Sequence, residues 1–149
     1  MIKKFLIINL FLFSFFLTNS YSDNNKYMSL KNNKVNVRYG PGLDYPIKFV
    51  FNKKNYPVEI IDQKENFRKI LDFKKNSGWI HRSQLKKGSS FITVDNAILF
   101  SDSTKFSRPI ARIEPGRLLN KKKCNLNWCK VETGEYKGWV LKENLWGLN

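Results

Sequence analysis

Hydrophobic and polar positions alternate along the chain in short runs that are separated by turn residues. The first run places Val35 and Val37 on either side of Asn36, which is the period of two expected of a half-buried β-strand. Comparable runs follow at residues 47–51, 58–61 and 68–71. Glycine, proline, asparagine and serine between the runs indicate turns. Because no convincing amphipathic helix interrupts them, the pattern predicts a small antiparallel barrel.

The same order of motifs recurs about 60 residues later. Residues 78–85 read GWIHRSQL and residues 138–145 read GWVLKENL, so that the glycine, the tryptophan, a β-branched residue and the final leucine coincide. Upstream of each, residues 66–70 and 127–131 share the order Asn, aromatic, any residue, Lys, β-branched residue. The repeat therefore predicts two tandem units of the same all-β fold.

The repeat also divides the chain. Residues 34–85 are expected to form the first barrel and residues 91–149 the second. Residues 86–90, with the sequence KKGSS, then form a linker that is short enough to restrict the relative orientation of the two barrels. Residues 23–33 are polar and rich in asparagine, and we expect them to be a flexible leader.

The first 22 residues have the order of a secretory signal peptide. Two lysines precede 13 almost wholly apolar residues at 5–17, and small residues at Ser20 and Ser22 follow. We expect cleavage after Ser22. The alternative is a retained anchor, but 13 helical residues span only about 20 Å of a hydrocarbon core of about 30 Å. A lipoprotein anchor needs a cysteine directly after the apolar run, and none is there.

The chain is strongly basic, with a net charge of +15 that becomes +13 when Lys3 and Lys4 are removed with the signal peptide. Such a charge favours anionic partners such as nucleic acid, acidic lipid or acidic cell-wall polymer. Most of the 27 basic residues are lysines, and only six are arginines. In an AT-rich genome, codon bias favours Lys, Asn, Ile and Phe. The positive charge is therefore explained either by an anionic partner or by codon bias. Because phosphate recognition usually relies on arginine forks, we expect no nucleic-acid partner.

Two motifs resemble the bacterial SH3 domain family. The family's opening is similar to residues 35–42, VNVRYGPG, followed by Asp44-Tyr45-Pro46. Its ending is similar to Gly138-Trp139-Val140 and the final Leu145, and the first unit has Phe67 and Ile70 where the family has Trp and Val before this ending. The opening of the second unit is degenerate, since residues 99–104 lack the arginine and both glycines. The resemblance implies two tandem SH3-like barrels that bind cell-wall peptide or other peptides.

A ligand groove is expected in the first unit, where the loop opening is intact. Arg38, Tyr39 and Tyr45 belong to this loop, and Trp79 would lie beside it. A peptide could lie across the aromatic rings while Arg38 meets a carboxylate. Trp79 also has a plain structural interpretation, which is packing into the core of the barrel.

Cys124 and Cys129 enclose four residues, which is a spacing that suits a hairpin. Facing residues of an antiparallel pair lie within disulfide range, and an exported protein enters an oxidising compartment. We therefore expect a disulfide, the alternative being two reduced and packed thiols. The run from Cys124 to Cys129 is also similar to that of exported Gram-negative proteins with tandem SH3-like domains.

The residues with catalytic potential do not form a recognisable constellation. His81 is the only histidine, both cysteines lie in the other unit, and the carboxylates are scattered. Nucleophilic catalysis needs a nucleophile beside an oriented base, and zinc needs a compact set of ligands. We expect no enzyme activity, no cofactor and no metal site.

The sequence therefore favours a periplasmic or secreted, non-catalytic binding module that recognises peptidoglycan stem peptide or another extended peptide. The alternative is a structural or scaffold protein whose barrels dock on another envelope protein without a small ligand. After signal cleavage we expect no segment that spans a membrane.

Overall fold

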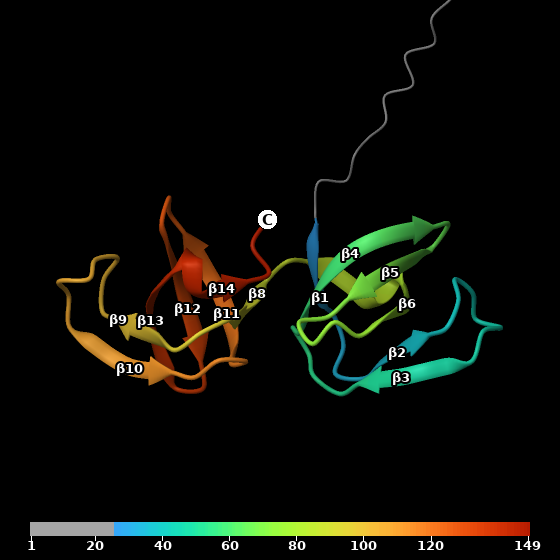
Figure 1. Cartoon of the computed structure of the whole chain (residues 1–149), viewed down its shortest axis with the longest axis horizontal. Coiled ribbons are helices and arrows are strands. Elements are labelled where there is room, and N and C mark those ends of the chain that lie inside the picture. The colour runs from blue at the N-terminus through green and yellow to red at the C-terminus, as the bar shows by residue number, and fades with distance from the viewer. Residues whose placement is uncertain (1–25) are drawn as a thin grey trace, which may run out of the picture.

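The computed structural model describes residues 26–149, which form two curved antiparallel sheets of seven strands each (Figure 1). This confirms the predicted all-β chain with two units in tandem. The predicted signal peptide and the start of the predicted leader lie outside the described residues. Within residues 26–149, no helix is long and apolar enough to cross a membrane.

The first unit has the strand order β3-β2-β6-β5-β4-β1-β7. Its elements are β1 (Tyr27–Leu30), β2 (Val35–Arg38), β3 (Ile47–Phe51), β4 (Pro57–Lys64), β5 (Phe67–Leu71), β6 (Ser77–His81), the 3-10 turn η1 (Arg82–Gln84) and β7 (Leu85–Lys87).

The second unit repeats this topology with the order β10-β9-β13-β12-β11-β8-β14. Its elements are β8 (Ser90–Thr93), β9 (Ala97–Phe100), β10 (Pro109–Ile113), β11 (Leu118–Cys124), β12 (Trp128–Thr133), β13 (Tyr136–Leu141), the 3-10 turn η2 (Lys142–Asn144) and β14 (Leu145–Trp146).

Each unit closes around a small core that is made by the inward positions of the alternating strands. Val35 and Val37 are buried in the first unit, whereas Asn36 between them is exposed. The corresponding strand of the second unit buries Ala97 and Leu99. Removal of these apolar side chains from water supplies most of the stabilisation of each barrel.

The expectation of a flexible leader at 23–33 was wrong for residues 27–30, which form β1. This strand pairs with β4 on one side and with β7 on the other. Leu30 is fully buried, and Met28 packs against the same core. The sequence did not predict this strand, because a strand of four residues has only two inward positions and polar residues surround them.

The predicted linker is also shorter than expected. Leu85–Lys87 form β7 and Ser90–Thr93 form β8, so only Gly88 and Ser89 lie between the two sheets. Ser90 is buried although it is polar. Its hydroxyl donates a hydrogen bond to the Asn55 carbonyl, and the Ser29 Oγ lies 2.9 Å from the Ser90 Oγ.

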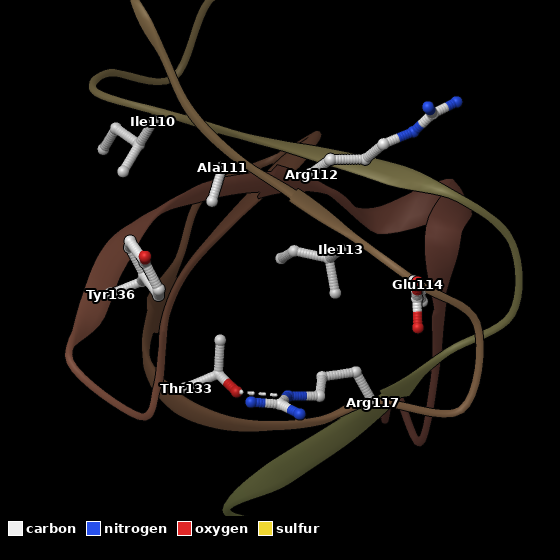
Figure 2. Close-up of a pocket in the computed structure, with 8 residues that line it drawn as sticks. All are labelled: Ile110, Ala111, Arg112, Ile113, Glu114, Arg117, Thr133 and Tyr136. Carbon is white, nitrogen blue, oxygen red and sulfur yellow. Dashed lines mark hydrogen bonds between the residues drawn. The ribbon is translucent and has the colours of Figure 1, made fainter.

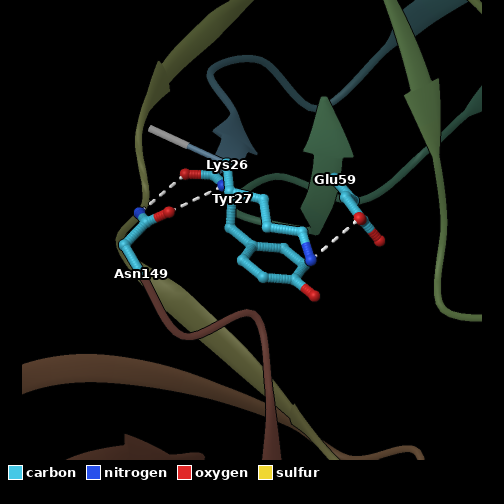
Figure 3. Close-up of polar contacts among 4 residues, drawn as sticks. All are labelled: Lys26, Tyr27, Glu59 and Asn149. Atoms are coloured by element: carbon cyan, nitrogen blue, oxygen red, sulfur yellow. Dashed lines mark hydrogen bonds and ion pairs between the residues drawn. The ribbon is translucent and has the colours of Figure 1, made fainter. Parts of the chain in front are cut away.

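Several other contacts join the two units. The side-chain amide of Asn149 makes two hydrogen bonds with the backbone of Tyr27 (Figure 3). Its Oδ1 accepts from the Tyr27 N–H at 2.7 Å, and its Nδ2 donates to the Tyr27 carbonyl at 2.9 Å. Trp146 of the second unit packs edge-on against Tyr27 and Phe73 of the first. Asn55 Nδ2 donates to Asn120 Oδ1 at 3.0 Å. The two barrels therefore meet through a specific junction.

Beside this junction, Lys26 and Glu59 form an ion pair of 3.2 Å on the surface of the first unit (Figure 3). The hydrogen bond from Lys26 to Glu59 raises the pKa of the lysine. Because the Lys26 side chain is exposed to solvent, the pair adds little to stability.

Candidate functional site

The outer face of the first sheet is built by paired positions on β2, β6 and β5. Arg38 lies opposite Trp79, and Trp79 lies opposite Lys69. One pair further along, His81 lies opposite Phe67. Ile80 between Trp79 and His81 is buried in the core, so its two neighbours project outward.

This face carries a groove of about 390 Å³. Its lining residues come from the segment before β2, from β2, β5 and β6, from the loop after β2 and from η1. They are Lys34, Asn36, Arg38, Leu43, Phe67, His81 and Gln84.

A second groove, of about 490 Å³, adjoins the first at His81, which lines both. It is lined by Met28, Asn66, Arg68, His81, Arg82 and Ser83. We call the two grooves together the unit 1 trough. Three arginines and one lysine face it, and none of its lining residues carries a carboxylate. The trough therefore suits an extended ligand with negative charge.

Arg38 has two roles in the structure. It lines the trough, and its Nη1 donates a 2.7 Å hydrogen bond to the Tyr45 carbonyl. The arginine thus holds the loop between β2 and β3 while the remaining N–H groups of its guanidinium stay available for other partners.

Tyr39, Tyr45 and Trp79, the other predicted site residues, lie beside the trough and are not among its lining residues. Tyr39 is 63% exposed and has the Lys48 ammonium 5.7 Å from its ring centre. Tyr45 is 42% exposed, and its ring packs so closely on Gly40 that a Cβ there would lie 2.2 Å from it. These tyrosines flank the trough on the same loop that supplies Leu43.

Sequence reasoning missed Phe67 and His81, which form the floor of the trough with their rings 5.2 Å apart in an edge-on arrangement. His81 Nδ1 accepts a hydrogen bond from the Ser83 N–H and lies 2.7 Å from the Ser83 hydroxyl. Both contacts cap the 3-10 turn η1, so they hold the imidazole in place. The alternation of Trp79 and His81 about buried Ile80 is the signal that could have identified His81.

The corresponding face of the second unit is filled by aromatic packing. Phe100 occupies the place of Arg38, opposite Trp139. Its ring lies 5.6 Å from the ring of Trp128, edge-on. Lys123 and Lys130 place their ammonium groups 5.5 Å and 5.9 Å from the Trp139 ring centre. The two repeats therefore differ where the first has its trough.

The disulfide between Cys124 and Cys129 is present and confirms the prediction. The two residues face each other at the end of the β11–β12 hairpin, with their Cα atoms 4.0 Å apart. Cys129 is fully buried among the core side chains of the second unit. Within residues 26–149, no group of three or more histidine, cysteine or acidic side chains is placed to hold a metal ion.

A family model described as the bacterial SH3 domain matches the chain twice, over residues 31–87 and 93–147. The chain belongs to the bacterial SH3 domain family. Each match covers six of the seven strands of one sheet, which confirms the resemblance inferred from the motifs. Bacterial SH3 domains are typically binding modules associated with the cell wall. No curated protein matches the chain.

Solved structures with similarity to this tandem of bacterial SH3 domains include NlpC2 and NlpC1 from Trichomonas vaginalis, each 16% identical, with TM-scores of 0.38 and 0.37. They cover 81% and 80% of this chain, and this chain covers 47% and 45% of theirs. An NlpC/P60 family protein from Bacillus cereus ATCC 10987 is 12% identical, with a TM-score of 0.36 and coverages of 80% and 55%. The chain spans about half the length of these structures.

Proposed function

We propose that this chain is a non-catalytic binding module of the cell envelope that holds an extended, carboxylate-bearing peptide in the unit 1 trough. Peptidoglycan stem peptide is the ligand that we test first. The observation that carries the proposal is the trough itself, in which Arg38, Arg68 and Arg82 face two grooves that adjoin at His81. An extended peptide could place one carboxylate in each groove.

The distribution of arginine supports an anionic ligand. Five of the six arginines line grooves, namely Arg38, Arg68, Arg82, Arg112 and Arg117. Of the far more numerous lysines within residues 26–149, Lys34, Lys53 and Lys74 line these four grooves. Guanidinium forks bind carboxylates with directional, paired hydrogen bonds, whereas ammonium groups act as point charges. Codon bias accounts for surface lysines but not for arginines that are concentrated in grooves.

An envelope location fits the rest of the molecule. The Cys124–Cys129 disulfide is expected of a protein that folds in an oxidising compartment. Export through the predicted signal peptide would bring the basic barrels to the anionic cell wall, where their charge strengthens retention.

A second candidate function is docking on another envelope protein without a small ligand. Phe106 is 99% exposed on the loop between β9 and β10, and Leu126 is 86% exposed at the tip of the β11–β12 hairpin. Hydrogen bonds of the Ser107 and Thr104 hydroxyls hold the Phe106 loop in shape. Exposed apolar side chains on an ordered loop are suited to a protein partner.

Binding to purified sacculi, and calorimetry with isolated stem peptide, test the trough. Arg38→Gln removes the charge and keeps a polar side chain, although the shorter glutamine ends before the position of Nη1, which bonds to the Tyr45 carbonyl. An unchanged melting temperature therefore has to show that the loop stays folded. A charge-assisted contact is worth about 1.5 to 3 kcal/mol, so affinity should fall at least tenfold. Tyr45→Ala should weaken binding less, because Tyr45 flanks the trough.

Arg108→Gln is the matched control, since Arg108 is the one arginine outside the grooves, and it should bind as the wild type does. If Arg38→Gln melts normally and still binds sacculi and peptide with wild-type affinity, the trough is not the site. Wild-type protein that binds no sacculi at any salt concentration would favour docking on an envelope protein. Activity in a zymogram would contradict the non-catalytic proposal.

A further inference from the structure

The second unit has its own groove, on a different part of its barrel from the face that Phe100 and Trp128 fill. The groove measures about 470 Å³ and is lined by Ile110, Ala111, Arg112, Ile113, Glu114, Arg117, Thr133 and Tyr136. We call it the unit 2 groove. Figure 2 shows these side chains around a common opening, with the three apolar side chains from β10 on one side and Arg117 opposite.

The backbone that carries Arg117 is held by the buried residue Thr93 of β8. The Thr93 N–H donates to the Arg117 carbonyl at 3.1 Å, and the Thr93 carbonyl accepts from the Gly116 N–H at 2.8 Å. The Thr93 hydroxyl accepts from the Arg117 N–H at 2.9 Å and donates to the Glu114 carbonyl at 2.7 Å. A fifth, longer bond of 3.4 Å runs from the Thr93 hydroxyl to the Arg117 carbonyl. Five hydrogen bonds to one residue therefore order the turn at residues 114–117.

The side chain of Arg117 is held as well. Its Nε donates to the Thr133 hydroxyl at 3.2 Å, and Thr133 is itself buried (Figure 2). This leaves the N–H groups of Nη1 and Nη2, for which the described part of the chain offers no hydrogen-bonding partner. A guanidinium that is oriented through Nε presents its Nη1 and Nη2 edge to a carboxylate. Because the side chain is already ordered, less conformational entropy is lost when the ligand binds.

The charges around the groove favour an anion only at Arg117. Glu114 lines the rim, but no ion pair joins it to Arg112 or Arg117 within residues 26–149. The side chain of Arg112 extends away from the opening in Figure 2, so we assign it no contact. The rest of the lining consists of Thr133, the half-exposed Tyr136 and the apolar Ile110, Ala111 and Ile113. The groove thus combines one oriented cation with an apolar wall of small and medium side chains.

The first unit has a groove at the same place in the fold, and its lining is different. Tyr56 takes the place of Arg117, because the Leu30 N–H bonds to the Tyr56 carbonyl as the Thr93 N–H bonds to that of Arg117. Asp72 takes the place of Thr133, each five residues after the first residue of its strand. Burial and, to a smaller extent, the Asp72 carboxylate raise the pKa of Tyr56.

That groove has an aromatic lining that includes Phe49, Phe51 and Phe73. The duplication therefore kept a groove at this position in both units but placed an oriented cation only in the second. In the first unit the Tyr56 carbonyl accepts the equivalent backbone bond, while the Asp72 carboxylate bonds to Asn76 instead. The turn can therefore form without a pair such as Arg117–Thr133.

We propose that the unit 2 groove is a second ligand site, which binds the terminal carboxylate of a peptide that ends in small apolar residues. Arg117 contacts the carboxylate, and Ile110, Ala111 and Ile113 contact the last side chains. The proposal does not depend on the unit 1 trough, since the two sites lie in different units and share no residue.

The test uses the whole mature chain labelled with ¹⁵N and two probes, acetyl-alanyl-alanine with a free carboxylate and the same dipeptide as its amide. We expect the acid to shift the backbone resonances of residues 114–117 and 133–136 in a saturable manner, and the amide to bind at least tenfold more weakly. Arg117→Gln should lower the affinity for the acid at least tenfold. Glu114→Gln should raise it, because one repelling charge is removed.

Arg108→Gln is the control, and it should bind the acid as the wild type does. Thr133→Val keeps the charge but removes its anchor, so the affinity should fall several-fold with an otherwise unchanged spectrum. The proposal is overturned if acid and amide bind equally, if Arg117→Gln binds like the wild type, or if the shifts map to the surroundings of Arg38 and His81. In the last case the unit 1 trough would stand and only the second site would fail.

Discussion

Gly78 and Gly138 show at the scale of single residues why each repeat places a glycine before its tryptophan. At both positions the strand passes so close to its neighbour that no side chain fits. A Cβ on Gly138 would lie 2.5 Å from the Phe100 carbonyl oxygen, and one on Gly78 would lie 2.4 Å from a methyl group of Val37. The glycine of the motif is therefore explained by the close approach of two strands. The tryptophan that follows the glycine covers the outer face of the sheet.

Gly138→Ala should destabilise the second unit by about 1–3 kcal/mol, which is the usual cost of overpacking. The obstacle includes backbone, which cannot move aside as a flexible side chain can. Chemical denaturation measures the effect, and Lys137→Ala on the same strand is the control, with an expected change below about 0.5 kcal/mol. Equal stabilities of Gly138→Ala and the wild type would mean that β13 and β9 can separate without cost.

The β11–β12 hairpin shows at the scale of elements how two units of one fold diverge. Both long hairpins have an irregularity of register at the same place, between Ile60 and Asp62 in the first unit and between Lys121 and Lys123 in the second. Only the second hairpin is closed by a disulfide. Such a bulge bends a strand and increases its twist, which helps a short sheet to close into a barrel.

Reduction of the Cys124–Cys129 disulfide should lower the stability of the second unit by about 2 kcal/mol, the chain-entropy value for a short loop. The denaturation midpoint of the wild type should therefore fall when a reductant is added. The double variant Cys124→Ala and Cys129→Ala should start from a lower midpoint and show no response to the reductant. A wild-type midpoint that stays the same after complete reduction would contradict the prediction.

The junction between the barrels matters at the scale of the whole molecule. In Figure 1 the strands β1 and β8 lie on the facing sides of the two units, close to the C-terminus. Ser89 donates its N–H to the Ser29 hydroxyl at 3.0 Å, and the Lys121 N–H donates to the Ser89 carbonyl at 2.9 Å. A two-residue connection with these bonds leaves the barrels little freedom to rotate. The trough and the unit 2 groove are therefore held at a set separation.

Trp146→Ala should weaken the coupling of the two units without unfolding either one. The tryptophan contacts Tyr27 and Phe73 across the junction, whereas the cores of both barrels lie elsewhere. We expect the thermal unfolding of the wild type to be one transition and that of the variant to be two. Leu126→Ala, which removes a side chain that is exposed on a hairpin tip, should leave the single transition intact.

A single transition in Trp146→Ala, with small-angle scattering identical to that of the wild type, would show that the hydrogen bonds of Ser29, Asn55 and Asn149 suffice to hold the junction. In that case the aromatic contact would add nothing to the coupling.

The candidate site could be predicted only in part. Arg38 was identified from the loop motif, and it does line the trough. Its neighbours Phe67 and His81 were not identified, because each looked like an ordinary strand position. Their importance comes from being paired across β5 and β6 on the outer face. Arg117 gave no signal in the sequence, since its orientation depends on Thr133, which lies 16 residues away.

By itself the sequence determined the repeat, the all-β class, four strands of the first unit, the disulfide and the family, because alternation, turn residues and motif spacing are local properties of the chain. The tertiary structure decided the short strands β1, β7, β8 and β14, the junction and the grooves. β1 became a strand only by pairing with β4 and β7. The residues that line the unit 1 trough come from separate positions between Met28 and Gln84. Such groupings depend on strand register and burial, which arise only when distant segments pack together.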